Sequence, residues 1–311
     1  MAQKRRIEIS ALNVLFCLSV IFIHIISYAV TACTPGTIEY NLAMIPWRLS
    51  SYVVQGFVML AGVKLFLNKK EDKPYLLHLR ARVKGVIVPY AVSFLVYYIY
   101  FVIVYKYTFD VMFILRHFLL GSLVFHLYFI PMLFQFDLLF PVWKKIVNKC
   151  SPVIIIPFAL LFSQLCESHL PQMISAVFPN VSFIYNDRIF TTYLAYWLIG
   201  CYIGKYYDSF CEILKKNFRT ICIIFVIVLL MVIYFSYLAY NNITSVPYMN
   251  MIHNLYVLYV CVFLYAVALK IPPKVYERIP LVTKIDKWSL YIYLYHILVI
   301  FLAEKLLRFI S

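Results

Sequence analysis

The sequence predicts an all-α protein, a polytopic membrane helical bundle of about 9–10 transmembrane helices, and two observations carry this prediction. Of its 311 residues, 64% are hydrophobic and only 13% are charged, about half the charged share of a soluble domain. Apolar stretches of about 20 residues, enough for a helix to cross a hydrocarbon core, recur along the whole chain. This composition excludes a soluble enzyme, a disordered chain and a small disulfide-stabilised protein.

Nine segments have the length and hydropathy of membrane spans. Because they follow one another along the whole chain, we expect residues 1–311 to form a single transmembrane domain. The segments are 9–30, 48–67, 86–107, 123–143, 152–169, 189–207, 219–240, 249–270 and 287–307. The apolar stretch 111–121 is shorter and carries Arg116 and His117, so we expect an interfacial or re-entrant helix there. If this stretch crossed the membrane, it would be the tenth span.

Positive charge is divided unevenly between the two sides of the predicted bundle. With the N-terminus in the cytoplasm, 21 of the 28 Lys and Arg residues fall in cytoplasmic segments and 6 on the outer side. This is the positive-inside pattern, and it predicts a cytoplasmic N-terminus and an outer C-terminus. The net charge of +15 therefore reports topology in a lipid bilayer and gives no support for nucleic-acid binding. The first span is too long for a cleavable signal peptide.

The eight cysteines show no spacing typical of a metal site. Zinc ligands usually occur as closely spaced pairs, and none is present in the sequence. We therefore expect no metal and interpret the cysteines as small apolar residues.

Ionisable side chains inside spans are costly in lipid, so each is a candidate functional residue. In the first span, Asn13 and His24 lie on one polar stripe, and the opposite faces of the helix are apolar. The stripe indicates either a wet cavity with a functional His24 or a helix contact in which His24 is a packing residue. Asp137 and His253 are interpreted as structural or as paired with a partner elsewhere in the chain. The remaining candidates are Lys64, His126 and His296.

A basic block precedes the third span on its cytoplasmic side and consists of Arg80, Arg82 and Lys84. Its members are two residues apart, so they fan out on a helix instead of forming one ridge. The block is either a topological anchor or a receptor for anionic phosphates, which arginine binds in a bidentate manner.

Five sequence blocks stand out along the chain: ISALNVLFCLSVIFIH (9–24), QGFVMLAG (55–62), RVKGVIVPY (82–90), HLYFIP (126–131) and KWSLYIYLYH (287–296). Together they resemble the acyltransferase-3 family of bacterial membrane acyltransferases. The likeness is greatest to the branch with O-acetyltransferase-like proteins of exopolysaccharide and enterobacterial common antigen modification. The order and spacing of the blocks extend over nearly the whole chain, and the combination carries the resemblance.

The resemblance implies transfer of an acyl group, most simply acetyl, from cytoplasmic acyl-CoA to a hydroxyl of a cell-surface glycan or glycolipid. It also implies a multi-pass protein of the bacterial plasma membrane. The essential histidine of the family corresponds to His24, and its late histidine corresponds to His296. The Ser-Gly pair of its second span corresponds to Ala61 and Gly62, with the serine replaced.

Roles in acyl transfer follow as hypotheses. His24 would be the general base, because an imidazole has a pKa near neutrality. Many family members carry Arg or Lys at the position of Asn13, which can donate a hydrogen bond to an oxyanion but supplies no charge. His126 and His296 would position the acceptor. The CoA phosphates would contact the basic block, Arg80, Arg82 and Lys84.

Two other classes of function remain open from the sequence. The first is a polysaccharide exporter or flippase without catalysis, because polar-lined bundles also serve transport. The second is a membrane scaffold whose polar residues are only packed. If the family chemistry holds, the acceptor must reach the bundle directly or a helper protein must complete the transfer, since no extracellular domain follows the last span.

Overall fold

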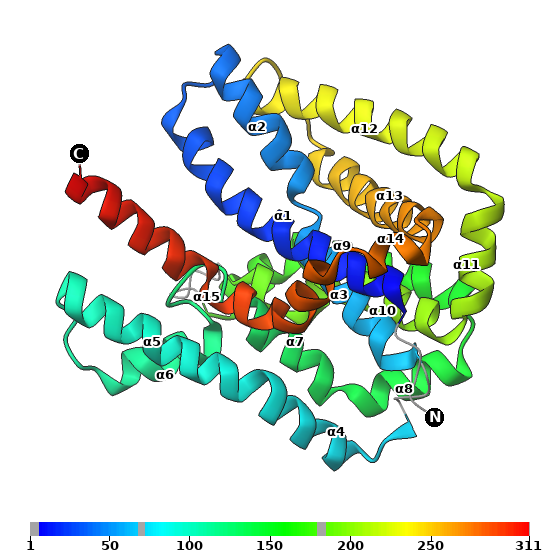
Figure 1. Cartoon of the computed structure of the whole chain (residues 1–311), viewed down its shortest axis with the longest axis horizontal. Coiled ribbons are helices and arrows are strands. Elements are labelled where there is room, and N and C mark those ends of the chain that lie inside the picture. The colour runs from blue at the N-terminus through cyan, green and yellow to red at the C-terminus, as the bar shows by residue number, and fades with distance from the viewer. Residues whose placement is uncertain (1–5, 68–71, 179–184, 311) are drawn as a thin grey trace. The chain divides into compact units, whose positions relative to one another are not determined.

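A computed structural model describes residues 6–67, 72–178 and 185–310, and within these ranges the regular structure is helical without a strand. This confirms the all-α class, and Figure 1 shows the path of the chain. The helices up to the middle of the chain are α1 (Ile7–Ala32), α2 (Ile38–Ser50), α3 (Val53–Phe66), α4 (Tyr75–Arg82), η2 (Val83–Ile87), α5 (Val88–Tyr105), α6 (Val111–Leu120), α7 (Phe129–Leu138) and α8 (Phe140–Lys149). Those that follow are α9 (Pro152–Val177), η3 (Asn186–Arg188), α10 (Phe190–Lys205), α11 (Tyr207–Lys216), α12 (Phe218–Tyr240), α13 (Met249–Lys270), α14 (Pro273–Glu277) and α15 (Pro280–Ile310).

Seven helical stretches in the described residues are long and apolar enough to cross a membrane, and each overlaps one of the predicted spans. The stretches are Ile7–Ala32, Ile38–Phe66, Tyr75–Tyr105, Pro152–Val177, Phe218–Tyr240, Met249–Lys270 and Pro280–Leu307. The segment 189–207 falls on α10, a helix of 16 residues. The segment 123–143 is not one helix, because α7 ends at Leu138 and α8 begins at Phe140. Pro141 explains the break, since it has no N–H for the carbonyl four residues earlier.

Local sequence explains the short helix α6. Asp110 accepts hydrogen bonds from the backbone N–H groups of Met112 and Phe113 and so caps its start. Gly121 ends it in the left-handed region, with φ of 60°. A helix of ten residues is about 15 Å long. The prediction that 111–121 is too short to span the membrane alone is therefore confirmed.

The chain divides into two compact units. Unit 1 contains residues 1–57 and 206–311, and unit 2 contains residues 58–205. In unit 1, α1 packs against α2, α13 and α15, and α12 packs against α13 and α2. In unit 2, α10 packs against α7, α8 and α9, and α4 packs against α7. The prediction of a single domain over 1–311 stays a prediction.

Glycines allow the backbones of α3 and α10 to approach each other in unit 2. A Cβ atom on Gly62 would lie 2.6 Å from the Trp197 carbonyl oxygen. A Cβ atom on Gly200 would collide with the backbone of Met59, and one on Gly204 with that of Val63. Gly200 and Gly204 are four residues apart, the small-xxx-small spacing of close helix pairs in membranes.

Lys84, the last member of the basic block, lies in a widened turn. Residues Val83–Ile87 form a π-helical turn, closed by a hydrogen bond from the Val88 N–H to the Val83 carbonyl. Pro89 accounts for the widening, because its ring would clash with the carbonyl of Gly85 in a regular α-helix. The turn sets the direction of Lys84 relative to the residues before it.

Candidate functional site

The histidine rings of α1 and α15 are stacked in unit 1. The ring centroids of His24 and His296 are 5.2 Å apart, and the ring planes differ by 27°. His24 is partly exposed, whereas His296 is buried. The structure thus brings together two of the predicted site residues, which lie 272 positions apart in the sequence.

A backbone contact fixes the tautomer of His296. Its Nδ1 lies 2.7 Å from the carbonyl oxygen of Tyr293. A carbonyl only accepts hydrogen bonds, so the hydrogen must be on Nδ1, and in the neutral ring the lone pair is then on Nε2. One nitrogen of the stacked pair is therefore held as a proton acceptor by the local backbone of α15.

The polar stripe of α1 faces the protein over its first half. Asn13 and Cys17 are buried, and Leu18 and Ile25 on other faces are half-exposed. In a membrane-spanning helix, such half-exposed apolar side chains face lipid. The prediction that the polar stripe faces the protein interior is therefore confirmed at Asn13 and Cys17.

Asn13 is bound to α15. Its Nδ2 donates to Asp286 Oδ1 at 2.7 Å and to Ser289 Oγ at 2.9 Å. An amide nitrogen carries two hydrogens, and each has a partner here. To serve as an oxyanion donor, Asn13 would have to exchange one of these contacts. In this arrangement, Asn13 joins α1 to α15 about three helical turns before the His24–His296 pair.

Asp137 organises the basic block in unit 2. Its Oδ1 accepts from His78 Nε2 at 2.9 Å, and its Oδ2 accepts from Arg82 Nε at 2.7 Å. The His78 ring also stacks on Phe140, with centroids 4.4 Å apart. The expectation that Asp137 pairs with a partner elsewhere in the chain is confirmed. These contacts join α4 to α7 and balance the charge of Arg82.

The three members of the basic block differ in exposure. Arg80 and Lys84 are exposed, whereas Arg82 is partly buried beside Asp137. The predicted fan-out along the helix is thus confirmed, because Arg82 turns toward the protein and the other two toward solvent. Arg80 and Lys84 are the members whose cationic groups are available to an anion.

His126 is buried in unit 2, in the turn before α7. The ring of Tyr97 from α5 meets it edge-on, with centroids 5.7 Å apart. His126 therefore packs within unit 2, and the His24–His296 pair belongs to unit 1.

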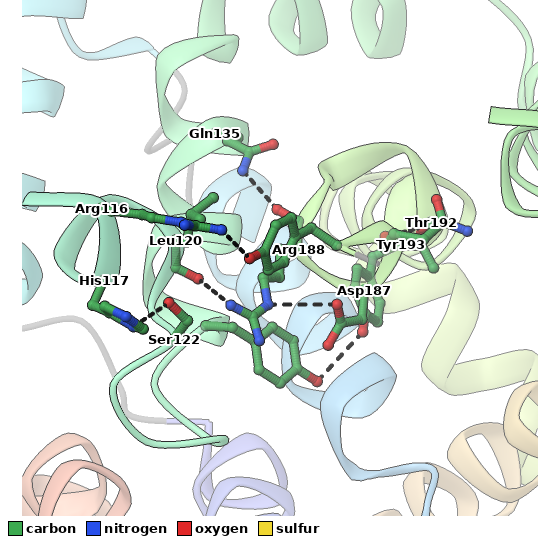
Figure 2. Close-up of polar contacts among 12 residues, drawn as sticks. Arg116, His117, Leu120, Ser122, Gln135, Asp187, Arg188, Thr192 and Tyr193 are labelled. Carbon is green, nitrogen blue, oxygen red and sulfur yellow. Dashed lines mark hydrogen bonds and ion pairs between the residues drawn. The ribbon is translucent and has the colours of Figure 1, made fainter. Parts of the chain in front are cut away.

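A second polar cluster of unit 2 surrounds Arg188. Figure 2 shows Arg188 between α6 and the start of α10, with its Nη1 donating to the Leu120 carbonyl at 3.1 Å and its Nε 3.6 Å from Asp187 Oδ1. The Arg188 carbonyl accepts from Gln135 Nε2 at 2.8 Å. Its guanidinium also lies 4.9 Å from the centre of the Tyr185 ring. Arg188 thus satisfies the carbonyl at the end of α6 and connects this helix to α7 and to Tyr185.

His117 and Arg116 border this cluster. Arg116 Nη2 donates to Tyr185 Oη at 3.1 Å, and His117 Nδ1 lies 2.7 Å from Ser122 Oγ (Figure 2). Burial lowers the pKa of His117, and the nearby charges of Arg116 and Arg188 lower it further, against the raising effect of the Ser122 contact. His117 is therefore held in its neutral form near pH 7.

Sequence reasoning missed several residues of these clusters. Asp286, Ser289 and His78 were not among the predicted site residues. Asp286 and Ser289 contact Asn13, which was predicted, and His78 shares its partner Asp137 with the predicted residue Arg82. Asp286 and His78 lie outside the predicted spans, where a polar residue carries no signal. In the described ranges, no group of His, Cys, Asp and Glu residues is arranged to hold a metal ion.

These features define a helical, multi-pass membrane protein with a stacked histidine pair between its first and last long helices. A family model described as an acyltransferase domain matches residues 6–311. The chain therefore belongs to the acyltransferase-3 family. No curated protein and no solved structure matches the chain. The family match extends over both units and contains every candidate site residue.

Proposed function

We propose that the chain is an O-acyltransferase that moves an acyl group, most simply acetyl, from cytoplasmic acyl-CoA to a hydroxyl of a cell-surface glycan or glycolipid. The stacked His24–His296 pair is the observation that carries this proposal. It supplies imidazole groups between two long apolar helices of a protein from an acyltransferase family. The proposed location is the bacterial plasma membrane, and exopolysaccharide modification is the proposed process.

The reaction requires a base and a route for one proton. The acceptor oxygen attacks the thioester carbonyl, the C–O bond forms, and His24 takes the hydroxyl proton. The tetrahedral intermediate then collapses, the C–S bond breaks, and His24 returns the proton to the departing thiolate. Atoms and charges balance with acyl ester and CoA as products. His296, whose Nδ1–H is bound to the backbone, supports the orientation of the His24 ring.

The exposed cations of the basic block suit the donor. Arg80 and Lys84 would bind the CoA phosphates, which are the anionic part of acyl-CoA. Arg82, already bound to Asp137, would hold α4 in place and add the remaining hydrogen-bonding capacity of its guanidinium. CoA is a co-substrate in this scheme, and no metal takes part in it.

The test is turnover of acetyl-CoA by the purified chain in lipid nanodiscs, followed as release of free thiol in the presence of a glycan acceptor. His24→Gln should lose at least 99% of the rate, since loss of a general base costs roughly 10²- to 10⁴-fold. His169→Gln is the matched control, because His169 is an exposed histidine of α9.

Two results would contradict the proposal. Full activity of His24→Gln would remove the assigned base. Movement of an unmodified glycan across the membrane, with no consumption of acetyl-CoA, would favour an exporter or flippase. Transfer that occurs only after a second protein is added would favour the helper protein over direct access of the acceptor.

A further inference from the structure

The apolar stretch Ile38–Phe66 is interrupted in the part that belongs to unit 1, and polar side chains lie at this interruption. α2 ends at Ser50, residues 51–52 form a turn, and α3 begins at Val53 (Figure 1). Backbone that leaves the helix at membrane depth is tolerated only where protein or a ligand site satisfies it. Discontinuous helices of this kind supply binding sites in membrane transporters.

Side chains satisfy the carbonyls that the break leaves open. Ser51 Oγ donates to the Arg48 carbonyl at 2.5 Å. Tyr256 Oη, from α13, donates to the Leu49 carbonyl at 2.7 Å. These two contacts hold the end of α2 against α13, and each consumes the hydrogen of a hydroxyl group.

The same contacts determine the tautomer of His253, a buried residue of α13. His253 Nε2 lies 3.2 Å from Ser51 Oγ. Because the Ser51 hydrogen is already donated to Arg48, the Ser51 oxygen must accept, and His253 Nε2 must carry the hydrogen. In the neutral ring, Nδ1 then has a lone pair. His253 Nδ1 is buried and has no hydrogen-bond partner among the described residues.

Arg48 is in the opposite situation, because within the described ranges it has a hydrogen-bond donor that lacks an acceptor. Among the described residues, its buried Nε has no hydrogen-bond acceptor, and no carboxylate of that part of the chain forms an ion pair with Arg48. Its guanidinium lies over the ring of Tyr240, with the guanidinium carbon 5.7 Å from the ring centroid. A partly buried cation without a counter-charge is costly in any protein and more so in lipid.

The two deficiencies specify one kind of ligand. An acceptor nitrogen without a donor calls for a hydroxyl hydrogen, and a donor cation without an acceptor calls for an anionic oxygen. Ser51 contacts both the backbone carbonyl of Arg48 and the ring of His253, so these two residues lie on either side of one hydroxyl group. Water can satisfy the hydrogen bonds but cannot balance the charge.

We propose that Arg48, Ser51 and His253 form a subsite for an anionic sugar, in which Arg48 binds the carboxylate or phosphate and His253 Nδ1 accepts a hydrogen bond from a sugar hydroxyl. The inference rests on the proposed function, since it names the acceptor class as an acidic glycan. It adds a binding site to the His24–His296 pair and assigns no bond-breaking role to His253.

Binding of sugars to the purified full chain in phosphatidylcholine nanodiscs, measured by calorimetry without acyl-CoA, tests the subsite. Glucuronate and glucose 6-phosphate are the probes, and they separate carboxylate from phosphate recognition. Neutral glucose should bind at least about tenfold more weakly than the better anionic probe, because a charge-assisted hydrogen bond contributes roughly 1.5–3 kcal/mol.

Two histidine substitutions form a matched pair. Gln places its amide nitrogen near the position of Nε2, so His253→Gln keeps the Ser51 contact and removes the Nδ1 acceptor. Asn places its amide oxygen near the position of Nδ1, so His253→Asn keeps an acceptor and removes the Ser51 contact. His253→Gln should weaken binding of the anionic probe about three- to tenfold. His253→Asn should bind it more tightly than His253→Gln.

A substitution of the cation completes the test. Arg48→Gln should weaken the anionic probe about ten- to a hundredfold and leave the affinity for glucose nearly unchanged. The melting temperature of each variant, measured in the same nanodiscs, shows that it is folded. His169→Asn should behave as the wild type.

Three outcomes would overturn the proposal. The first is that the wild type shows no saturable binding of either anionic sugar. The second is that both Arg48→Gln and His253→Gln bind the anionic probe with unchanged affinity. The third is that sugar binding is lost when phosphatidylglycerol replaces phosphatidylcholine. The last outcome would assign the site to a lipid headgroup.

The binding test and the turnover test fail separately. If the sugars bind but acetyl-CoA is never consumed, the proposed function fails and the subsite stands. If acetyl-CoA is consumed and the KM for an acidic acceptor is the same in His253→Gln, the subsite fails and the function stands.

Discussion

Replacement of Asp137 by Asn tests whether the contact between α4 and α7 is energetically important. The carboxylate is almost fully buried and accepts from two side chains, His78 Nε2 at 2.9 Å and Arg82 Nε at 2.7 Å. Asn is nearly the same size, but its side chain has one acceptor oxygen and one donor nitrogen. Asp137→Asn therefore removes the negative charge beside Arg82 and places an N–H opposite one of the two donors, to which only the neutral His78 ring could adapt, by moving its hydrogen to Nδ1.

The expected loss can be worked from these contacts. Hydrogen bonds to charged groups contribute about 1.5–3 kcal/mol each, and removing one partner of a buried ion pair costs about 3–5 kcal/mol. The Arg82 side chain is 30% exposed, so water recovers part of its solvation. We expect Asp137→Asn to lower the free energy of unfolding by about 2–4 kcal/mol.

Reversible unfolding of the purified chain from mixed micelles measures this change. Tryptophan fluorescence is a suitable signal, since Trp143 lies next to the contact and donates to the Phe136 carbonyl at 2.9 Å. Asp208→Asn is the matched control, because Asp208 forms an exposed ion pair with Arg6 and its side chain is 84% exposed. The control should lose less than about 1 kcal/mol.

Equal destabilisation by the two substitutions would refute this reasoning. A double-mutant cycle gives the sharper result. Arg82→Gln and Asp137→Asn together should cost less than the sum of the single changes, with a coupling of about 1 kcal/mol or more. A coupling near zero would mean that the contact between Arg82 and Asp137 does not contribute to stability.

Three further predictions concern packing, donor binding and topology. Gly200→Ala should lower the free energy of unfolding by about 1–3 kcal/mol because its Cβ meets the Met59 backbone, whereas Gly85→Ala, with nothing within 4 Å of its Cβ, should be neutral or slightly stabilising. Arg80→Gln should raise the KM for acetyl-CoA about ten- to a hundredfold, and Lys149→Gln should not; an unchanged KM would make the block a topological anchor. Impermeant thiol reagents should label single cysteines introduced at 34–37 from outside; labelling from the cytoplasm would reverse the predicted orientation.

The sequence by itself determined the class of protein and most of its long helices. Composition and span length suffice for this, because each membrane helix satisfies its own backbone and must be apolar over about 20 residues. The same local rules predicted the short helix at 111–121 and the polar stripe of α1. They also singled out His24, because an ionisable group in an apolar helix stands out against its neighbours.

Only the tertiary structure decided which residues meet. His24 and His296, or Asn13 and Asp286, are separated by more than 270 positions, and no local pattern relates one to the other. The sequence analysis also missed the break between α7 and α8 inside the segment 123–143. Hydropathy is averaged over many residues, so it does not reveal the single hydrogen bond that Pro141 removes. From their charge alone, the sequence could not show which of Arg80, Arg82 and Lys84 is buried and which are exposed. Their difference arises from Asp137, a residue on another helix that buries one cation and leaves the other two exposed.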